Sequence, residues 1–166
     1  MHLRAARPDD APALAALFAD AVRAAGPARY SPPQVEAWAA AADHPRALWH
    51  RLLRHDTFVA EDETGPIGFA GLAPDGHVTA LYVRPDRMRR GVGSALLDAV
   101  LARAETLGLG RLYAEASLFS LPLFERAGFT RSHVERIERR GVRFERHHVV
   151  RVAGEAGGVD GGVRNA

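Results

Sequence analysis

Hydrophobic residues in the first third of the chain recur mainly at the spacing of helices. Residues 2–7 alternate weakly between apolar and polar and predict a short first strand. Pro8-Asp9-Asp10 suits a helix start, because proline and acidic residues favour a first turn, and Gly26-Pro27 ends that helix. Ser31-Pro32-Pro33 predicts a second helix start, and a short third helix is expected over about residues 45–54. The first helix has an apolar stripe for burial at Leu14, Leu17, Phe18, Ala21 and Val22.

From residue 57 onward the pattern changes to short strands around one long helix. The strongest strand pattern covers residues 77–83, and the most regular helical pattern covers 92–107 and ends at Gly108. This order predicts a mixed α/β (α+β) domain over residues 2–153, followed by a glycine-rich tail at 154–166 that is expected to be disordered. The other expected elements are strands at 57–60, 67–72, 111–116, 129–138 and 142–152 and a short helix at about 119–127.

Composition narrows the classes of chemistry that are open to this chain. There are 0 cysteines, which excludes disulfides, thiolate catalysis and cysteine zinc sites. All 22 basic residues are arginine, so the pI of about 9.6 exceeds what a net charge of +2 suggests. The arginines are scattered, and we therefore regard nucleic-acid binding as unlikely. No run approaches the ~20 apolar residues of a membrane span, and the N-terminal residues lack a signal-peptide pattern, so a cytoplasmic location is expected.

The segment with most chemical information joins the strand at 77–83 to the helix at 92–107. Gly91 and Gly93 allow a tight turn and a close approach of the backbone to a ligand. The first amides of the helix have no intrahelical acceptor, and the helix dipole favours negative charge there. Arg87, Arg89 or Arg90 could add charge-assisted bonds, so the loop predicts a phosphate or pyrophosphate site. The loop matches neither the P-loop nor the dinucleotide-binding fingerprint.

Two stretches about thirty residues apart carry a family resemblance. LYVRPDRMRRGVGSALL followed by ASLFSLPLFERAGF resembles the GNAT N-acetyltransferase superfamily, and the resemblance covers roughly residues 2–152. It implies a central mixed, mostly antiparallel twisted sheet of about six to seven strands, flanked by helices and splayed at the two central strands. It also implies transfer of an acetyl group from acetyl-CoA to a primary amine of a small molecule or peptide by direct attack, without a metal.

The resemblance assigns cofactor contacts residue by residue. The loop would bind the CoA pyrophosphate, the strand backbone would bind the pantetheine and thioester, and the later short helix would close the other side. Met88 replaces the usual glutamine or arginine, and Phe124 replaces a tyrosine that protonates the departing sulfur in many members. The expected cofactor-binding residues are Leu81, Tyr82, Val83, Met88, Arg89, Arg90, Gly91, Val92, Gly93, Ser94, Ser117, Ser120, Leu123 and Phe124.

Candidates for acid–base chemistry are fewer. His77 is the first candidate for general base, because imidazole titrates near neutral pH, and Tyr82 is the second. Backbone amides near Tyr82 or Val83 would hold the oxyanion. Tyr30 belongs to a segment that borders the acceptor pocket in the family, whereas Trp38 and Tyr113 are expected in the core. No histidine has the partners of a metal site, so no metal is expected.

Three readings stay open at the level of sequence. The chain could be an active acetyltransferase, or an acyl-CoA-binding module with little catalysis, since Phe124 is no acid and no carboxylate base is obvious. It could also acetylate an amine linked to a nucleic acid. The strands near the C-terminus would allow a homodimer, although the pattern does not require one.

Overall fold

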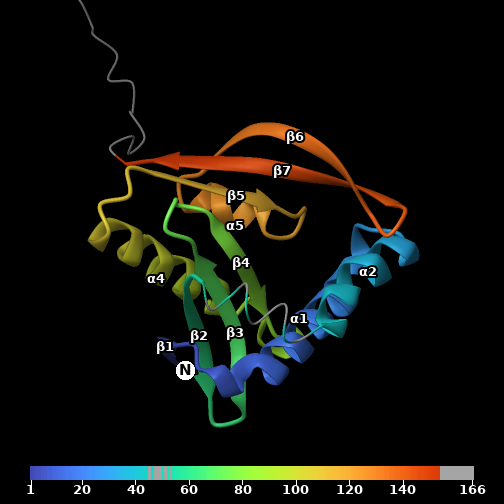
Figure 1. The fold of residues 1–166 in the computed structure, drawn as a ribbon, viewed down its shortest axis with the longest axis horizontal. Helices are drawn as coiled ribbons and strands as arrows, with labels where there is room; N and C mark the ends of the chain where they lie inside the picture. The colour runs from blue at the N-terminus through green and yellow to red at the C-terminus, as the bar shows by residue number, and fades with distance from the viewer. Residues whose placement is uncertain (45, 47–49, 51, 53, 154–166) are drawn as a thin grey trace, which may run out of the picture.

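The computed structural model describes residues 1–44, 46, 50, 52 and 54–153. In this part of the chain seven strands form two sheets, and the element order follows the sequence prediction (Figure 1). The expected third helix falls mostly outside the described residues, and the glycine-rich tail at 154–166 lies outside them entirely.

The first sheet is antiparallel, in the order β1-β2-β3-β4, and comes from the N-terminal half. Its strands are β1 (His2–Ala5), β2 (Asp56–Asp62), β3 (Gly65–Leu72) and β4 (Val78–Val83). The second sheet, β5-β7-β6, is also antiparallel and consists of β5 (Arg111–Ala116), β6 (Thr130–Arg139) and β7 (Val142–Val152). One parallel bridge, between His77 just before β4 and Tyr113 of β5, joins the backbones of the two sheets in the described residues. The expected splay of the two central strands is therefore confirmed.

Helices cover both faces of the first sheet (Figure 1). On one side lie α1 (Ala11–Ala25) and α2 (Pro32–Ala39), and on the other lies α4 (Val92–Thr106). The short α5 (Leu121–Arg126) packs under the second sheet. Short 3-10 turns at Pro8–Asp10, Gly26–Ala28, Ala40–Asp43 and Pro85–Arg87 connect these elements.

The α1 helix starts three residues later than the sequence pattern predicts. Pro8–Asp10 forms a 3-10 turn first, and α1 begins at Ala11. In this turn the Asp10 carboxylate accepts a hydrogen bond from the backbone N–H of Arg7 and two from Arg4, at 2.7, 2.7 and 2.8 Å. These bonds tie the start of α1 to strand β1.

Strand alternation assigns each side chain of the splayed strands to one of two hydrophobic clusters. Leu81 and Val83 of β4 pack on the cluster that contains α4 and α5, whereas Tyr82 packs on the cluster of α1 and α2. In β5 the buried Leu112, Ala114 and Ala116 belong to the α4 cluster. Because side chains alternate along a strand, Tyr113 and Glu115 face the α1 and α2 side.

The α4 helix lies directly on β3 at a glycine. A Cβ at Gly68 would stand 2.9 Å from Leu96 Cδ1, 3.0 Å from the Tyr82 carbonyl oxygen and 3.1 Å from Val92 Cγ1. Leu96 and Val92 are buried, so they have little room to move. This close approach fixes the position of the N-terminal turn of α4, which belongs to the candidate site.

We predict that Gly68→Ala lowers the free energy of unfolding by about 1–3 kcal/mol, because the added methyl overpacks the contact between β3 and α4. Urea denaturation of the purified protein measures this change. Gly110→Ala is the matched control, because no atom lies within 4 Å of its Cβ position. Equal stability of the two variants would show that α4 is not held at Gly68.

Candidate active site

The N-terminus of α4 is built as an open anion-binding turn. Gly91 is its N-cap, with φ +83°, and no side chain caps the helix there. A Cβ at Gly91 would have no atom within 4 Å, so the space beside the turn is open. The first turn contains no acidic residue, and its leading amides have no intrahelical acceptor. The turn can therefore accept an anion.

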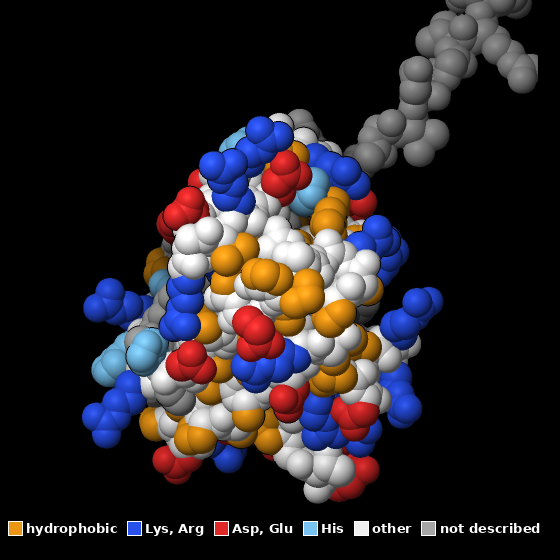
Figure 2. Space-filling model, turned by 90° about the vertical axis from the view of Figure 1, so that its right-hand side faces the viewer, with side chains coloured by type: hydrophobic (Ala, Val, Ile, Leu, Met, Phe, Trp, Pro, Cys, Tyr) orange, Lys and Arg blue, Asp and Glu red, His pale blue; other side chains and the backbone are white. Residues whose placement is uncertain are grey.

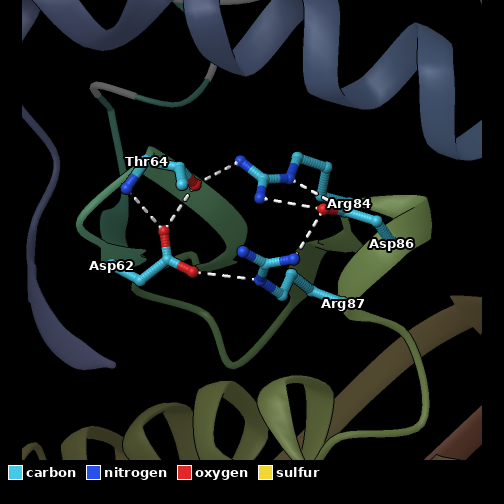
Figure 3. Close-up of polar contacts among 5 residues, drawn as sticks. All are labelled: Asp62, Thr64, Arg84, Asp86 and Arg87. Carbon is cyan, nitrogen blue, oxygen red and sulfur yellow. Dashed lines mark hydrogen bonds and ion pairs between the residues drawn. The ribbon is translucent and has the colours of Figure 1, made fainter.

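A polar network fixes the loop that precedes this turn (Figure 3). Arg87 donates from Nε to Asp62 Oδ2 at 3.0 Å and from Nη1 to Asp86 Oδ2 at 2.6 Å. Arg84 donates to Asp86 Oδ1 at 2.6 Å and to Thr64 Oγ1 at 2.9 Å. Hydrogen bonds from Thr64, with a further contribution from Arg87, hold the pKa of Asp62 well below its usual range. The network ties the β2–β3 turn to the start of the loop.

The arginines of the loop therefore divide into two groups. Arg84 and Arg87 are engaged by carboxylates, so the expectation that Arg87 could bind a pyrophosphate is not supported. Arg89 has φ +59°, is exposed and lines the neighbouring pocket. Arg90 is exposed but is not among the lining residues.

A pocket of about 500 Å³ runs from this turn into the gap between β4 and β5. Val92 does not line it, because its side chain is buried in the core beneath. Arg126 of α5 does line it, and sequence reasoning missed this second cation. The expected cofactor residues that line the pocket are Leu81, Tyr82, Val83, Met88, Arg89, Gly91, Gly93, Ser94, Ser117, Ser120, Leu123 and Phe124.

The wall formed by α5 and the residues before it supplies hydroxyl groups and an aromatic ring. Ser117 Oγ and Ser120 Oγ lie 3.1 Å apart, and the Ser120 hydroxyl also accepts the backbone N–H of Ser117 at 3.0 Å. Phe124 is 3% exposed and packs edge-on against Phe129, with 5.0 Å between ring centroids. A phenyl ring at this place offers a packing surface and no proton.

The opposite wall is aromatic. Tyr82 lines the pocket and packs edge-on against Phe18, with ring centroids 4.7 Å apart. Trp38, expected only as a core residue, lines the pocket as well as packing on the α1 cluster. Tyr30 is not a lining residue; its ring lies 5.5 Å from that of Trp38 and 5.9 Å from that of Phe119. It therefore supports two lining side chains from behind.

The Tyr30 hydroxyl joins two distant parts of the wall. Its oxygen accepts the backbone N–H of Leu118 at 3.1 Å, and burial raises the pKa of the phenol. The hydroxyl is thus already used to fix the segment between β5 and α5.

His77 lies next to the pocket but is not among its lining residues. Its Nε2 is 2.7 Å from Oε2 of Glu115, and its ring stacks on Tyr113 with centroids 4.8 Å apart and planes 4° apart. Glu115 does line the pocket, and its hydrogen bond to His77 holds the pKa of its carboxyl below the usual range. Sequence reasoning missed Glu115, although the alternation of β5 would have placed it on the face shared with Tyr82.

Tyr113 corrects another expectation. It was expected in the core, but the side chain is only half-buried, and its hydroxyl donates to Asp75 Oδ2 at 2.6 Å. This bond raises the pKa of the phenol and lowers that of Asp75. Asp75 also accepts the backbone N–H of His77 at 3.1 Å. Asp75 and Tyr113 therefore hold the backbone of His77 in place beside β5.

Among the described residues, no cluster of three or more His, Asp or Glu side chains could hold a metal ion. Within the same residues, no helix is long and apolar enough to cross a membrane.

Comparisons with known proteins place this geometry in a family. A family model described as an acetyltransferase (GNAT) domain matches residues 27–149. The uncharacterized N-acetyltransferase YafP of Escherichia coli (strain K12) is 33% identical over 145 residues, which is 87% of this chain and 91% of that protein. The chain therefore belongs to the GNAT acetyltransferase family.

Solved structures agree with this assignment. A GCN5-related N-acetyltransferase from Rhodopseudomonas palustris superposes with a TM-score of 0.87 at 32% identity, covering 91% of this chain and 94% of that one. The PaiA N-acetyltransferase of Thermoplasma acidophilum, solved in complex with coenzyme A, has a TM-score of 0.72 at 16% identity and covers 92% and 99%. At this lower identity the second likeness shows the fold alone.

We predict that Asp62→Ala loosens the loop before α4, because Arg87 then loses the carboxylate that anchors it to β2. Backbone hydrogen exchange over residues 84–91 is expected to become roughly fivefold faster, the effect of one lost net hydrogen bond. Hydrogen–deuterium exchange with mass spectrometry measures it.

Asp56→Ala is the control for this change. Asp56 lies at the other end of β2 and pairs with Arg103 at 2.7 Å, away from the loop. If the two variants give the same exchange over residues 84–91, the network does not hold the loop.

Proposed function

We propose that this chain transfers an acetyl group from acetyl-CoA to a primary amine of a small molecule or peptide. One observation carries the proposal: a single pocket joins the open N-terminus of α4 to the gap between the splayed strands β4 and β5. A cofactor in which a long arm extends from a diphosphate fits this shape. The coenzyme A complex of the T. acidophilum relative, which shares the fold, supports this choice of cofactor.

The diphosphate would bind at the α4 end. The amides of Gly93 and Ser94 and the guanidinium of Arg89 are available there, and Arg126 approaches from α5 on the other wall. Arg90, exposed beside the turn, would add charge. Arginine forks suit phosphate oxygens, so Met88 in place of a polar residue does not remove the anion site.

The arm would lie along β4. The backbone at Leu81 to Val83 would bind the pantetheine and the thioester oxygen, and Leu123 and Phe124 would pack on the arm from α5. Ser117 and Ser120 would contact the arm through their hydroxyls.

The chemistry would be direct attack of the amine on the thioester. No cysteine is present to form an acyl-enzyme, so both substrates would have to be bound together. His77 and Tyr82 are the proposed proton carriers from sequence, and Tyr82 lines the pocket directly. Phe124 provides no acid, but a thiol with a pKa of about 8.5 leaves readily as a thiolate, so no acid is required there.

The other two readings have less support. The acyl-CoA-binding module rested partly on the lack of a carboxylate near the reaction centre, and Glu115 lines the pocket. For a nucleic-acid-linked amine a continuous basic face is needed. On the face shown in Figure 2, arginine and acidic side chains of the described residues are interspersed. In addition, Arg136 pairs with Glu145 and Arg146 pairs with Glu135, so that these arginines are neutralised. A homodimer and a cytoplasmic location remain predictions.

We predict that wild-type protein binds acetyl-CoA with a dissociation constant in roughly the micromolar range, and that Gly93→Leu weakens binding at least about tenfold. A Cβ at Gly93 stands 3.1 Å from Leu123 Cδ2 and 3.6 Å from Val83 Cγ2, so the larger side chain would enter the pocket. Isothermal titration calorimetry measures both constants, and thiol release with a panel of amines then tests transfer.

Ala102→Leu is the matched control, because it places the same side chain at an exposed position on the same helix. It should bind acetyl-CoA as wild type does. Absence of binding to wild type would refute the cofactor site, and binding without transfer to any amine would favour the binding module.

A further inference from the structure

Glu115 is the one carboxylate among the described residues that line the pocket. It lies on β5, facing α1 and α2, and its side chain is 21% exposed. The neighbouring wall on that face is apolar and partly aromatic; its members are Ala21, Val22, Ala25, Trp38, Tyr82 and Phe119. A single negative charge at the end of an apolar wall is complementary to a cation on an apolar arm.

His77 lies directly behind this carboxylate. The imidazole and Glu115 share a 2.7 Å contact through Nε2 and Oε2, and the His77 side chain is 28% exposed. A carboxylate can accept about four hydrogen bonds, so one contact to His77 leaves room for an ammonium group. The imidazole thus connects the pocket carboxylate to solvent.

The other charged groups near Glu115 are already paired. Arg146 and His148 of β7 lower the pKa of Glu115 through their charges, without direct contact. Both contact Glu135 of β6 instead, and His148 Nε2 lies 2.9 Å from Glu135 Oε2. Tyr113, next to Glu115 on the same face, donates its hydroxyl to Asp75. These pairings leave the negative charge of Glu115 directed at His77 and at the pocket.

We infer that Glu115 binds the ammonium group of the acceptor and, with His77 behind it, removes the proton that must leave before the amine can attack. The acceptor that fits is a primary amine on an apolar or aromatic arm. This inference rests on the proposed function and names the substrate class of that site. Glu115 would be a catalytic residue, and His77 would act through it as a relay.

The reaction balances without another reagent. The N–C bond of the amide forms as the C–S bond of the thioester breaks, and the ammonium loses two protons in all. One passes by Glu115 and His77 to solvent, and the other ends on the CoA sulfur. No acid is needed at position 124, because the sulfur leaves as a thiolate and is protonated afterwards.

The pH dependence follows from the same groups. The hydrogen bond from His77 lowers the pKa of Glu115, so the carboxylate is ionised throughout the neutral pH range. It loses its charge only as the pH falls through this lowered pKa. Without the carboxylate, only the fraction of the amine that is already unprotonated can react. The rate of Glu115→Gln should therefore rise about tenfold per pH unit towards the pKa of the amine, with a shallower rise in wild type.

The test uses 2-phenylethylamine and its neutral counterpart 2-phenylethanol, titrated calorimetrically into the protein saturated with CoA. We expect wild type to bind the amine at least about tenfold more tightly than the alcohol, the effect of one hydrogen bond to a charged group. In Glu115→Gln this preference should vanish while the affinity for CoA is unchanged. Ethanolamine, which lacks the apolar arm, should bind weakly to wild type and to Glu115→Gln.

Glu125→Gln is the control for loss of a carboxylate. Glu125 lies on α5, outside the pocket lining, and pairs with Arg131 at 2.6 Å. It should keep the preference for the amine.

The outcomes separate the two claims. CoA binding without any preference for amine over alcohol in wild type overturns the inference and leaves the cofactor site intact. If Glu115→Gln still prefers the amine over the alcohol, the role of Glu115 is overturned. The same holds if the kcat of Glu115→Gln, measured with 2-phenylethylamine and acetyl-CoA at pH 7, falls less than about tenfold. Failure of wild type to bind CoA overturns the proposed function and this inference together. The comparison in wild type needs no variant, so a poorly folded Glu115→Gln would not block the test.

Discussion

The separation of β4 from β5 is the constraint on which the rest of the structure depends. Two neighbouring parallel strands would ordinarily be joined by a ladder of hydrogen bonds along their length. Here the described residues form one bridge, at His77 and Tyr113, and the sheets then diverge. The divergence creates a pocket that residues of α1, β4 and the start of α4 line on one side and residues of β5 and α5 line on the other.

Two devices hold the edges of this opening at defined positions. At the α4 end, Gly68 lets the helix lie directly on β3, and the arginine–carboxylate network fixes the loop from the other side. At the opposite end, Asp75 and Tyr113 hold His77 where the strands part. At both ends these paired polar groups hold the backbone in place. Neighbouring side chains that line the pocket, Arg89 at one end and Glu115 at the other, are left to contact a ligand.

The sequence was informative where local chemistry decides the structure. Gly91, Gly93 and the regular pattern of residues 92–107 predict the open helix start, and strand periodicity predicts the seven strands. It was uninformative where contacts link distant residues. Neither Arg87 nor Asp62 reveals its partner across 25 positions. The alternation of β5 places Glu115 on the face shared with Tyr82, but no local pattern shows that a pocket opens on that face. Tyr113 was placed wrongly because strand position alone does not show that its sheet ends beside it.

The single backbone bridge between the two sheets has a consequence for the stability of the whole domain. Residues that line the pocket come from both sheets and from helices on each side, so a ligand that fills it adds contacts across a boundary where the backbones of the two sheets share one β-bridge. Binding and folding are then coupled by mass action: a ligand present at about 100 times its dissociation constant stabilises the folded state by about 2.7 kcal/mol. The ligand would thus contribute to the folding stability of the protein as well as react in its pocket. When the ligand is scarce, a larger fraction of the chains would be unfolded.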